Sequence, residues 1–380
     1  MKLALVGDVS GNRYDLARLG GALAARGHEV EIITASPRPA ACDVDVIGIP
    51  LEANAGEDFR RPESLTPAIS EIGRFLVDRW HREQPDVVHC HDWTYGMAAQ
   101  LAAKYTPIPT VQSFHGLAGN APRSTPQAAS ANRAGIEALL AKNAAMVTVA
   151  CTDDMGEVIR SGCPRARVSV LPPGVDIDED AGDGTGDTSG SARQQIVSMT
   201  EDLAEHSGAD RVVRALPALP GAELTLICAD VDRRDLARLH GTADHLGVSG
   251  RIRVVPGATG HEVVPHLRGA DVVVCPSSYD PRATPALQAM AAGVAVVATE
   301  TGGPRDAVVA DVTGVLVPPG NTEALSRALR SLLGQKVLRQ GMGLTGRARV
   351  RSRYSWERIA TDAEVIYEAA LTRVGDMSAR

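Results

Sequence analysis

Short apolar runs alternate with helical stretches along this chain, and this alternation limits the possible folds more than any other feature. The pattern begins with "KLALV" at residues 2–6, a helical stretch, and "EVEIIT" at residues 29–34. Within the helical stretch, Leu16, Leu19 and Leu23 have the spacing of one helix face. Strands that alternate with helices of this length form a parallel sheet covered on both faces. The sequence therefore predicts a doubly wound α/β domain.

A polar segment rich in Gly, Asp, Ser and Thr, "DEDAGDGTGDTSGS", interrupts the alternation at residues 178–191 and predicts a flexible linker. The alternation then restarts, and 380 residues with 44% apolar content suit two hydrophobic cores. We expect a first α/β domain at 1–177, a second at 192–354, and a leftover helix at 355–380. Ligands of open α/β sheets bind beyond the carboxyl ends of the strands, so we expect the site in a cleft between two facing domains.

Charge and composition exclude several classes of function. The net charge is −7, and the Lys and Arg residues are scattered rather than clustered, which argues against nucleic-acid binding. The opening "MKLALVGD" has four consecutive apolar residues, too few for a signal peptide or a membrane span, so we expect a cytoplasmic protein. The six cysteines show no zinc-ligand spacing and are expected to be reduced thiols in the cores.

Residues 270–324, "ADVVVCPSSYDPRATPALQAMAAGVAVVATETGGPRDAVVADVTGVLVPPGNTEAL", resemble the retaining glycosyltransferases of family 4, which have the two-domain GT-B fold. Members typically read PS-x-x-E-P-F-G-x-x-x-L-E-A-M-A-x-G-x-P-V-V-A-T, then GG and TG-x-L-V-P-P. The first half is similar in "GALAARGHEVEIIT", "PDVVHCHDW", "QSFHGL" and "VSVLPPGVD". The resemblance implies Rossmann-like domains, an acceptor-side first domain, a second domain that binds a nucleotide sugar, and a final helix that crosses back to the first domain.

The stretch "TPALQAMAAG" specifies a helix that could receive a diphosphate. Thr284 suits the N-cap, Pro285 the first helical position and Gly293 the C-terminal stop. The N-terminus of such a helix presents free N–H groups and the positive end of the helix dipole to an anion. By resemblance, Asp280 contacts the transferred sugar and Gln288 the ribose.

Four positions on the donor side depart from the family pattern. Two glutamates are replaced by Asp280 and Gln288, an arginine by Met199 and, with a less certain alignment, a lysine by Ser207. Each lost charge-assisted hydrogen bond to a leaving diphosphate costs roughly 1.5 to 3 kcal/mol, which implies another cation, another kind of donor, or a chain that has abandoned catalysis.

Arg282 is the candidate replacement cation, because it follows Asp280 by two residues and precedes the helix. Its planar guanidinium suits bidentate contact with phosphate, although a side chain pointing into water is an equally good reading. The neighbouring Ala283 and Thr284 are assigned to donor binding with it. Weaker alternative cations are His206, Arg193 and Arg211.

Candidates in the first domain follow its expected strands. His115 ends a strand where the family carries a histidine near the reacting carbon of the sugar, and we assign it a catalytic role with Asp280. Gly11 is expected to approach the donor phosphate. Ser10, Asn12 and His91 are expected on the acceptor side.

His89, His91 and Asp92 in "HCHDW" resemble a metal cluster, but the resemblance implies a fold that uses no metal. A structural or acceptor-side role is preferred for them. No cofactor is expected.

The resemblance implies a retaining, metal-independent transferase that moves a sugar from a nucleoside diphosphate sugar to a small-molecule acceptor. The acceptor hydroxyl attacks on the face that the diphosphate leaves, and the diphosphate takes the proton. Two alternatives stay open: an inactive pseudo-glycosyltransferase that acts as a binding or scaffold subunit, and a transferase that forms a non-glycosidic bond. The donor base, the sugar, the acceptor and the oligomeric state are not predicted.

Overall fold

The computed structural model divides the chain into two compact units. Unit 1 comprises Met1–Gly174 and Trp356–Arg380, and unit 2 comprises Val175–Ser355. The expected linker at 178–191 lies outside the described residues, and so do Ser10, Gly11 and Asn12. The structure describes residues 1–9, 16–36, 42, 44–51, 62–122, 132–177, 193–257 and 262–378.

Unit 1 contains a seven-stranded parallel sheet with the strand order β3-β2-β1-β4-β5-β6-β7. Its strands are β1 (Lys2–Val6), β2 (Glu29–Thr34), β3 (Asp45–Gly48), β4 (Val87–His91), β5 (Thr110–Phe114), β6 (Met146–Val149) and β7 (Val168–Val170). Its helices are α1 (Leu16–Ala25), α2 (Pro62–Arg82), α3 (Trp93–Ala102), α5 (Arg133–Asn143), α6 (Thr152–Arg160) and α14 (Trp356–Ser378), with a 3-10 turn at Arg165–Arg167.

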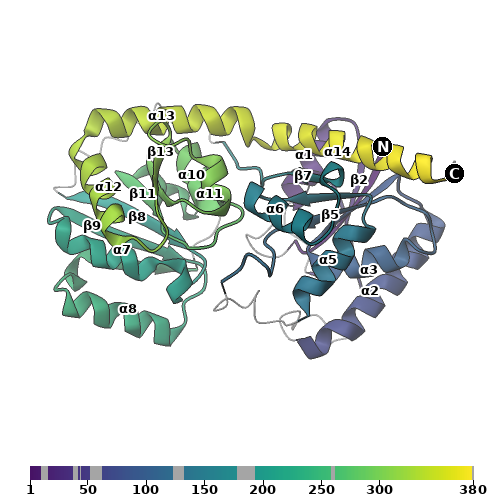
Figure 1. Cartoon of the computed structure of the whole chain (residues 1–380), viewed down its shortest axis with the longest axis horizontal. Coiled ribbons are helices and arrows are strands. Elements are labelled where there is room, and N and C mark those ends of the chain that lie inside the picture. The colour runs from purple at the N-terminus through teal and green to yellow at the C-terminus, as the bar shows by residue number, and fades with distance from the viewer. Residues whose placement is uncertain are drawn as a thin grey trace. The chain divides into compact units, whose positions relative to one another are not determined.

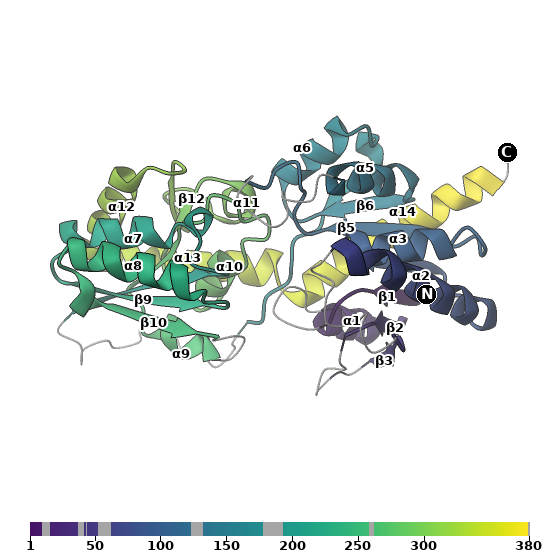
Figure 2. The same ribbon diagram turned by 90° about the horizontal axis from the view of Figure 1, so that it is seen from below.

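Successive side chains of β1 point to opposite faces of the sheet, and both sets are apolar, so helices cover both faces. Leu3 and Leu5 pack in a core with α1 and α14, whereas Ala4 and Val6 pack in a second core with α2 and α3. Figures 1 and 2 show α14 beside α1, with α2 and α3 on the opposite face. Tyr367 of α14 is fully buried in the first of these cores. The last helix therefore contributes directly to the hydrophobic core of unit 1.

Unit 2 contains a six-stranded parallel sheet with the strand order β10-β9-β8-β11-β12-β13. Its strands are β8 (Gln194–Thr200), β9 (Ala222–Cys228), β10 (Ile252–Pro256), β11 (Val272–Cys275), β12 (Val296–Thr299) and β13 (Gly314–Val317). Its helices are α7 (Ala209–Ala215), α8 (Arg233–His245), α9 (Val264–Arg268), α10 (Thr284–Ala291), α11 (Gly302–Ala307), α12 (Thr322–Gly334) and α13 (Lys336–Arg353), with 3-10 turns at Glu205–Ser207, Leu216–Ala218 and Ser249–Arg251.

Alternation along β11 again separates two cores. Val272 and Val274 pack on the side of α7, α8 and α12, and Val273 and Cys275 pack on the side of α10. The expectation of two doubly wound α/β domains is confirmed. All six cysteines lie within the described residues and are unpaired, and all except Cys42 are buried.

Each sheet reverses its strand order at one point, which indicates where a ligand binds. The reversal lies between β1 and β4 in unit 1 and between β8 and β11 in unit 2. In open α/β sheets the crevice at the carboxyl ends of such strands is the usual binding site. Among the helices that the structure describes, none is long and apolar enough to span a bilayer.

Candidate functional site

The loops that follow β8 and β11 lie against each other at the switch point of unit 2. The carbonyl oxygen of His206 accepts hydrogen bonds from the backbone N–H and the hydroxyl of Ser278, both at 3.0 Å. Arg211 donates to the carbonyl oxygen of Pro276 at 2.8 Å. Gly208 has a φ of 76°, and a Cβ there would collide with that same carbonyl, so only glycine fits. The two loops are thus fixed to each other beside the predicted donor residues.

The turn before α10 is organised by Asp280. One of its carboxylate oxygens, Oδ1, accepts the backbone N–H groups of Ala283 at 2.9 Å and of Arg282 at 3.2 Å. The N–H of Gly303 donates to the carbonyl oxygen of Asp280 at 2.9 Å. A Cβ at Gly303 would come within 2.7 Å of the backbone of Pro281 and Ala283. The glycine therefore allows the start of α11 to lie against this turn.

The predicted N-cap at Thr284 is wrong. Thr284 is the first residue of α10 and Pro285 the second, and the capping residue is Ala283, whose φ of 55° lies in the left-handed region. The carboxylate of Asp280 satisfies the N–H of Ala283, so no side chain at Thr284 is needed as a cap. At the other end Gly293, with a φ of 75°, terminates the helix as predicted.

This geometry leaves fewer backbone N–H groups for a diphosphate at the N-terminus of α10 than expected. Asp280 already occupies two of the N–H groups before α10, and Pro285 has no N–H to offer. Burial raises the pKa of Asp280, while the charge of Arg282 and the two backbone hydrogen bonds act in the opposite direction. Arg282 is half-buried, and its charge acts on Asp280. The arginine thus carries positive charge at the end of the helix where the chain's own carboxylate sits.

Met199 and Ser207, which stand where the family pattern has cations, carry no charge. Met199 is 7% exposed and belongs to the core on the α10 side of the sheet. The hydroxyl of Ser207 donates to the carbonyl oxygen of Ala204 at 2.7 Å. Gln288 is half-buried on α10, one helical turn beyond Thr284. The structure therefore brings Asp280, Arg282, Ala283, Thr284 and Gln288 together on one turn and helix.

The weaker alternative cations have other partners. Arg193 forms an ion pair with Glu223 at 2.8 Å, and Arg211 is bonded to the Pro276 carbonyl. His206 lies 3.4 Å from Asp202, whose hydrogen bond is the main cause of the raised pKa of His206. Arg282 is preferred by its position, two residues before the first residue of α10.

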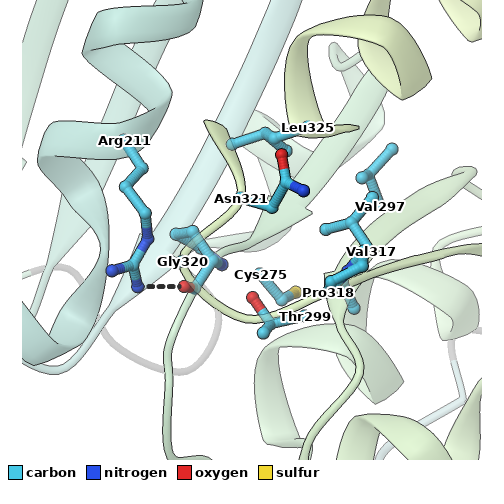
Figure 3. A pocket seen from close by; sticks show the side chains of 11 residues that line it. Arg211, Cys275, Val297, Thr299, Val317, Pro318, Gly320, Asn321 and Leu325 are labelled. Atoms are coloured by element: carbon cyan, nitrogen blue, oxygen red, sulfur yellow. Dashed lines mark hydrogen bonds between the residues drawn. The ribbon is translucent and has the colours of Figure 1, made fainter. Parts of the chain in front are cut away.

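A separate pocket opens at the carboxyl ends of β11, β12 and β13, on the face that α7 and α12 cover. Figure 3 shows Arg211 on one side of it and Val297 and Val317 on the other, with Cys275 and Thr299 between them. Its lining includes Arg211, one of the weaker alternative cations, but none of Met199, Ser207, Arg282, Ala283, Thr284 and Gln288. The turn that carries Asp280 and Arg282 therefore does not line this pocket.

In unit 1, His115 follows β5 directly, as predicted, and lies next to His91 at the end of β4. His91 Nδ1 and His115 Nε2 are hydrogen-bonded at 3.0 Å, and the two rings are nearly parallel, with an angle of 14°. Burial holds the pKa of His91 well below its ordinary value, and the neighbouring His89 and His115 lower it further. Burial also lowers the pKa of His89 to about 3. Both buried imidazoles are therefore neutral at physiological pH.

The "HCHDW" motif has structural partners in unit 1. His89 is hydrogen-bonded to Ser113 at 2.7 Å and to Tyr367 at 2.8 Å. Asp92 caps α3 by accepting the N–H of Trp93 at 2.7 Å. Within the described part of the chain, no group of three or more His, Cys, Asp or Glu side chains is arranged to hold a metal ion.

Buried carboxylates hold the loop that carries His115, and sequence reasoning missed them. Glu137 accepts the N–H of Ala118 at 3.0 Å and the guanidinium of Arg133 at 2.6 Å. Asp154 accepts the side-chain amide of Asn120 at 2.8 Å. The i,i+4 spacing of Arg133 and Glu137 was a usable signal. Nothing in "TDDMG" marked Asp154 as fully buried.

Asp154 should make the stability of the protein depend on pH. Burial raises its pKa to about 7, and its Oδ2 accepts no hydrogen bond from the described residues. Between about pH 4 and pH 7 the folded state keeps a proton that the unfolded state loses, so stability falls as pH rises, by about 1.4 kcal/mol per unit. Asp154→Asn removes this titration. Relative to that variant, the wild type should lose about 2 kcal/mol of unfolding free energy from pH 5 to pH 7.

Urea unfolding followed by circular dichroism at pH 5, 6 and 7 measures this difference. Asp78→Asn, at an exposed aspartate of α2, is the control and should keep the wild-type slope. Parallel pH profiles for the wild type and Asp154→Asn would show that Asp154 is ionised throughout.

Comparison with known proteins agrees with the two-unit architecture. Residues 10–174 match the family model of the glycosyl transferase 4-like domain, and residues 189–349 match that of the glycosyl transferases group 1. A D-inositol 3-phosphate glycosyltransferase of Xylanimonas cellulosilytica is 30% identical, over 97% of this chain and 93% of the relative. A glycogen synthase of Mycobacterium tuberculosis is 28% identical, over 93% and 89%.

Solved structures share the fold. Sucrose-phosphate synthase of Thermosynechococcus elongatus superimposes with a TM-score of 0.81 at 23% identity, covering 96% of this chain and 98% of the other. Anabaena HepE in complex with UDP-glucose superimposes with a TM-score of 0.74 at 18% identity, covering 97% and 100%.

Proposed function

Because the chain belongs to the family 4 glycosyltransferases of the GT-B type, we propose that it moves a sugar from a nucleoside diphosphate sugar to a small-molecule acceptor, with retention of configuration and without a metal ion or other cofactor. The observation that carries the proposal is the turn from Asp280 to Ala283 at the N-terminus of α10, beside the strand-order reversal of unit 2. The complex of Anabaena HepE with UDP-glucose supports this choice of donor.

The diphosphate is assigned to Arg282 and to the N–H of Thr284. Arg282 supplies the charge that Met199 and Ser207 lack, and Thr284 is the first helical residue. The carboxylate of Asp280 shares this end of the helix, so it shifts toward the sugar hydroxyls when the phosphates bind. Gln288, on the same helix, hydrogen-bonds the ribose as a neutral amide.

The transfer needs no nucleophile from the protein. The bond between the sugar carbon and the diphosphate oxygen breaks, the acceptor oxygen bonds to that carbon from the same face, and the leaving diphosphate takes the hydroxyl proton. The protein contributes positioning and electrostatic stabilisation. His115 is assigned to the transferred sugar, and Ser10 and Asn12 to the acceptor side, while Gly11 is assigned to the donor phosphate. The buried His91 acts on the acceptor side only through its hydrogen bond to His115.

The stereochemistry of the product tests this proposal. The protein is incubated with a panel of nucleotide sugars and polyol, sugar and sugar-phosphate acceptors, and the new anomeric proton is followed by NMR. We expect an α-configured donor to give an α-configured product, at the same rate with and without EDTA. A β-configured product would refute retention, and loss of activity with EDTA that returns with a divalent cation would refute metal independence.

A further inference from the structure

Three imidazoles form a continuous row in unit 1, from helix α14 to the end of β5. This histidine row consists of His89, His91 and His115. Tyr367 of α14 is hydrogen-bonded to His89 at 2.8 Å, and the ring centroids of His89 and His91 are 4.1 Å apart. The 3.0 Å hydrogen bond between His91 and His115 completes the row.

The chemistry of two facing imidazoles couples their tautomers. A neutral imidazole has one N–H donor and one bare nitrogen acceptor. When Nδ1 of His91 faces Nε2 of His115, only one of the two nitrogens can carry the shared hydrogen. Because His91 stays neutral in its buried position, the tautomers of the two rings are coupled: when Nδ1 of His91 carries the hydrogen, a neutral His115 is protonated on Nδ1, and otherwise on Nε2.

The surroundings leave the His91 ring little freedom. His91 is 5% exposed and lies between the rings of His89 and His115. A Cβ at Gly7, at the end of β1, would come within 2.9 Å of the His91 Cβ, so the glycine is needed for His91 to fit. The parallel register pairs His91 with Ser113, which places His115 two residues further along.

We propose that His91 is a positioning residue, which fixes the ring orientation and the tautomer of His115 for sugar transfer. The link to sugar transfer rests on the proposed function, whereas the effect on the tautomer does not. The His89 ring packs against the His91 ring and is itself held by hydrogen bonds to Ser113 and Tyr367.

The test measures the His115 tautomer directly. The full-length protein is labelled with ¹⁵N-histidine, and two-bond ¹H–¹⁵N correlation spectra are recorded above the pH at which His115 protonates. We expect one neutral tautomer of His115 in the wild type, a mixture of both in His91→Leu, and recovery toward one in His91→Asn, whose side-chain amide stands at the position of the His91 Nδ1. His81→Leu, at an exposed histidine of α2, is the matched control and should leave the His115 signals unchanged.

Kinetics provide the second readout. His91→Leu should lower kcat by about tenfold and change KM for the donor by less than about twofold, with partial recovery in His91→Asn. Should His91→Leu fail to fold, His91→Gln, whose amide is displaced by one methylene from the position of Nδ1, takes its place in the same spectra. An identical tautomer population of His115 in the wild type and in a folded His91→Leu, or in His91→Gln in its place, would overturn the proposal, even in a protein that transfers no sugar.

Discussion

Replacing His115 with alanine should lower the kcat of sugar transfer by about 100-fold or more and change the free energy of unfolding by only about 1 kcal/mol. His115 is half-buried directly after β5 and is hydrogen-bonded to His91. A mechanism without a protein nucleophile depends on groups positioned around the reacting sugar, so the loss of one such group costs far more in rate than in stability.

The rate of nucleoside diphosphate release and thermal unfolding of the same preparation check this expectation. His81→Ala, at an exposed histidine in the same unit, is the control and should retain wild-type turnover. A kcat within about threefold of the wild type in His115→Ala would remove this residue from the reaction.

Replacing Arg282 with alanine should weaken binding of the nucleoside diphosphate by about 10- to 150-fold, which corresponds to one charge-assisted contact of roughly 1.5 to 3 kcal/mol. The physical reason is that Met199 is buried in a core and the Ser207 hydroxyl is bonded to the backbone, so neither can supply charge to the phosphates. Arg282 precedes the first helical residue of α10 by two positions.

Arg327→Ala is the control for a general effect of losing one positive charge on unit 2. The side chain of Arg327 is 68% exposed on α12. Arg282→Lys keeps the charge but not the planar fork, and it should retain part of the affinity. Equal dissociation constants for the wild type and Arg282→Ala would show that the phosphates are bound elsewhere.

The architecture could be predicted because alternating apolar periods fix both the element type and the parallel pairing. The same logic identified α10 and its glycine stop at Gly293. It could not identify the start of α10, where Ala283 has a left-handed φ and the Asp280 carboxylate accepts its N–H. Local capping preferences contain no information about a carboxylate three residues away that folds back on the turn.

The buried polar contacts of unit 1 were also missed, for a different reason. His91 and His115 are 24 positions apart and meet only through the parallel register of β4 and β5. Asp154 belongs to a residue type that is almost always exposed, so its burial beneath the loop that carries His115 contradicts the usual expectation. Such contacts depend on packing between elements, which the pattern along a single element does not contain.

Isothermal titration calorimetry of the wild-type protein with UDP, ADP, GDP and their sugar conjugates tests most directly whether the altered donor site is functional. We predict that at least one of these nucleotides binds with a Kd below about 1 mM, and that Arg282→Ala weakens the same nucleotide at least about tenfold. Absence of heat for every nucleotide at millimolar concentration, with the protein folded by circular dichroism, would contradict the assignment of a nucleotide-sugar donor to this turn and helix.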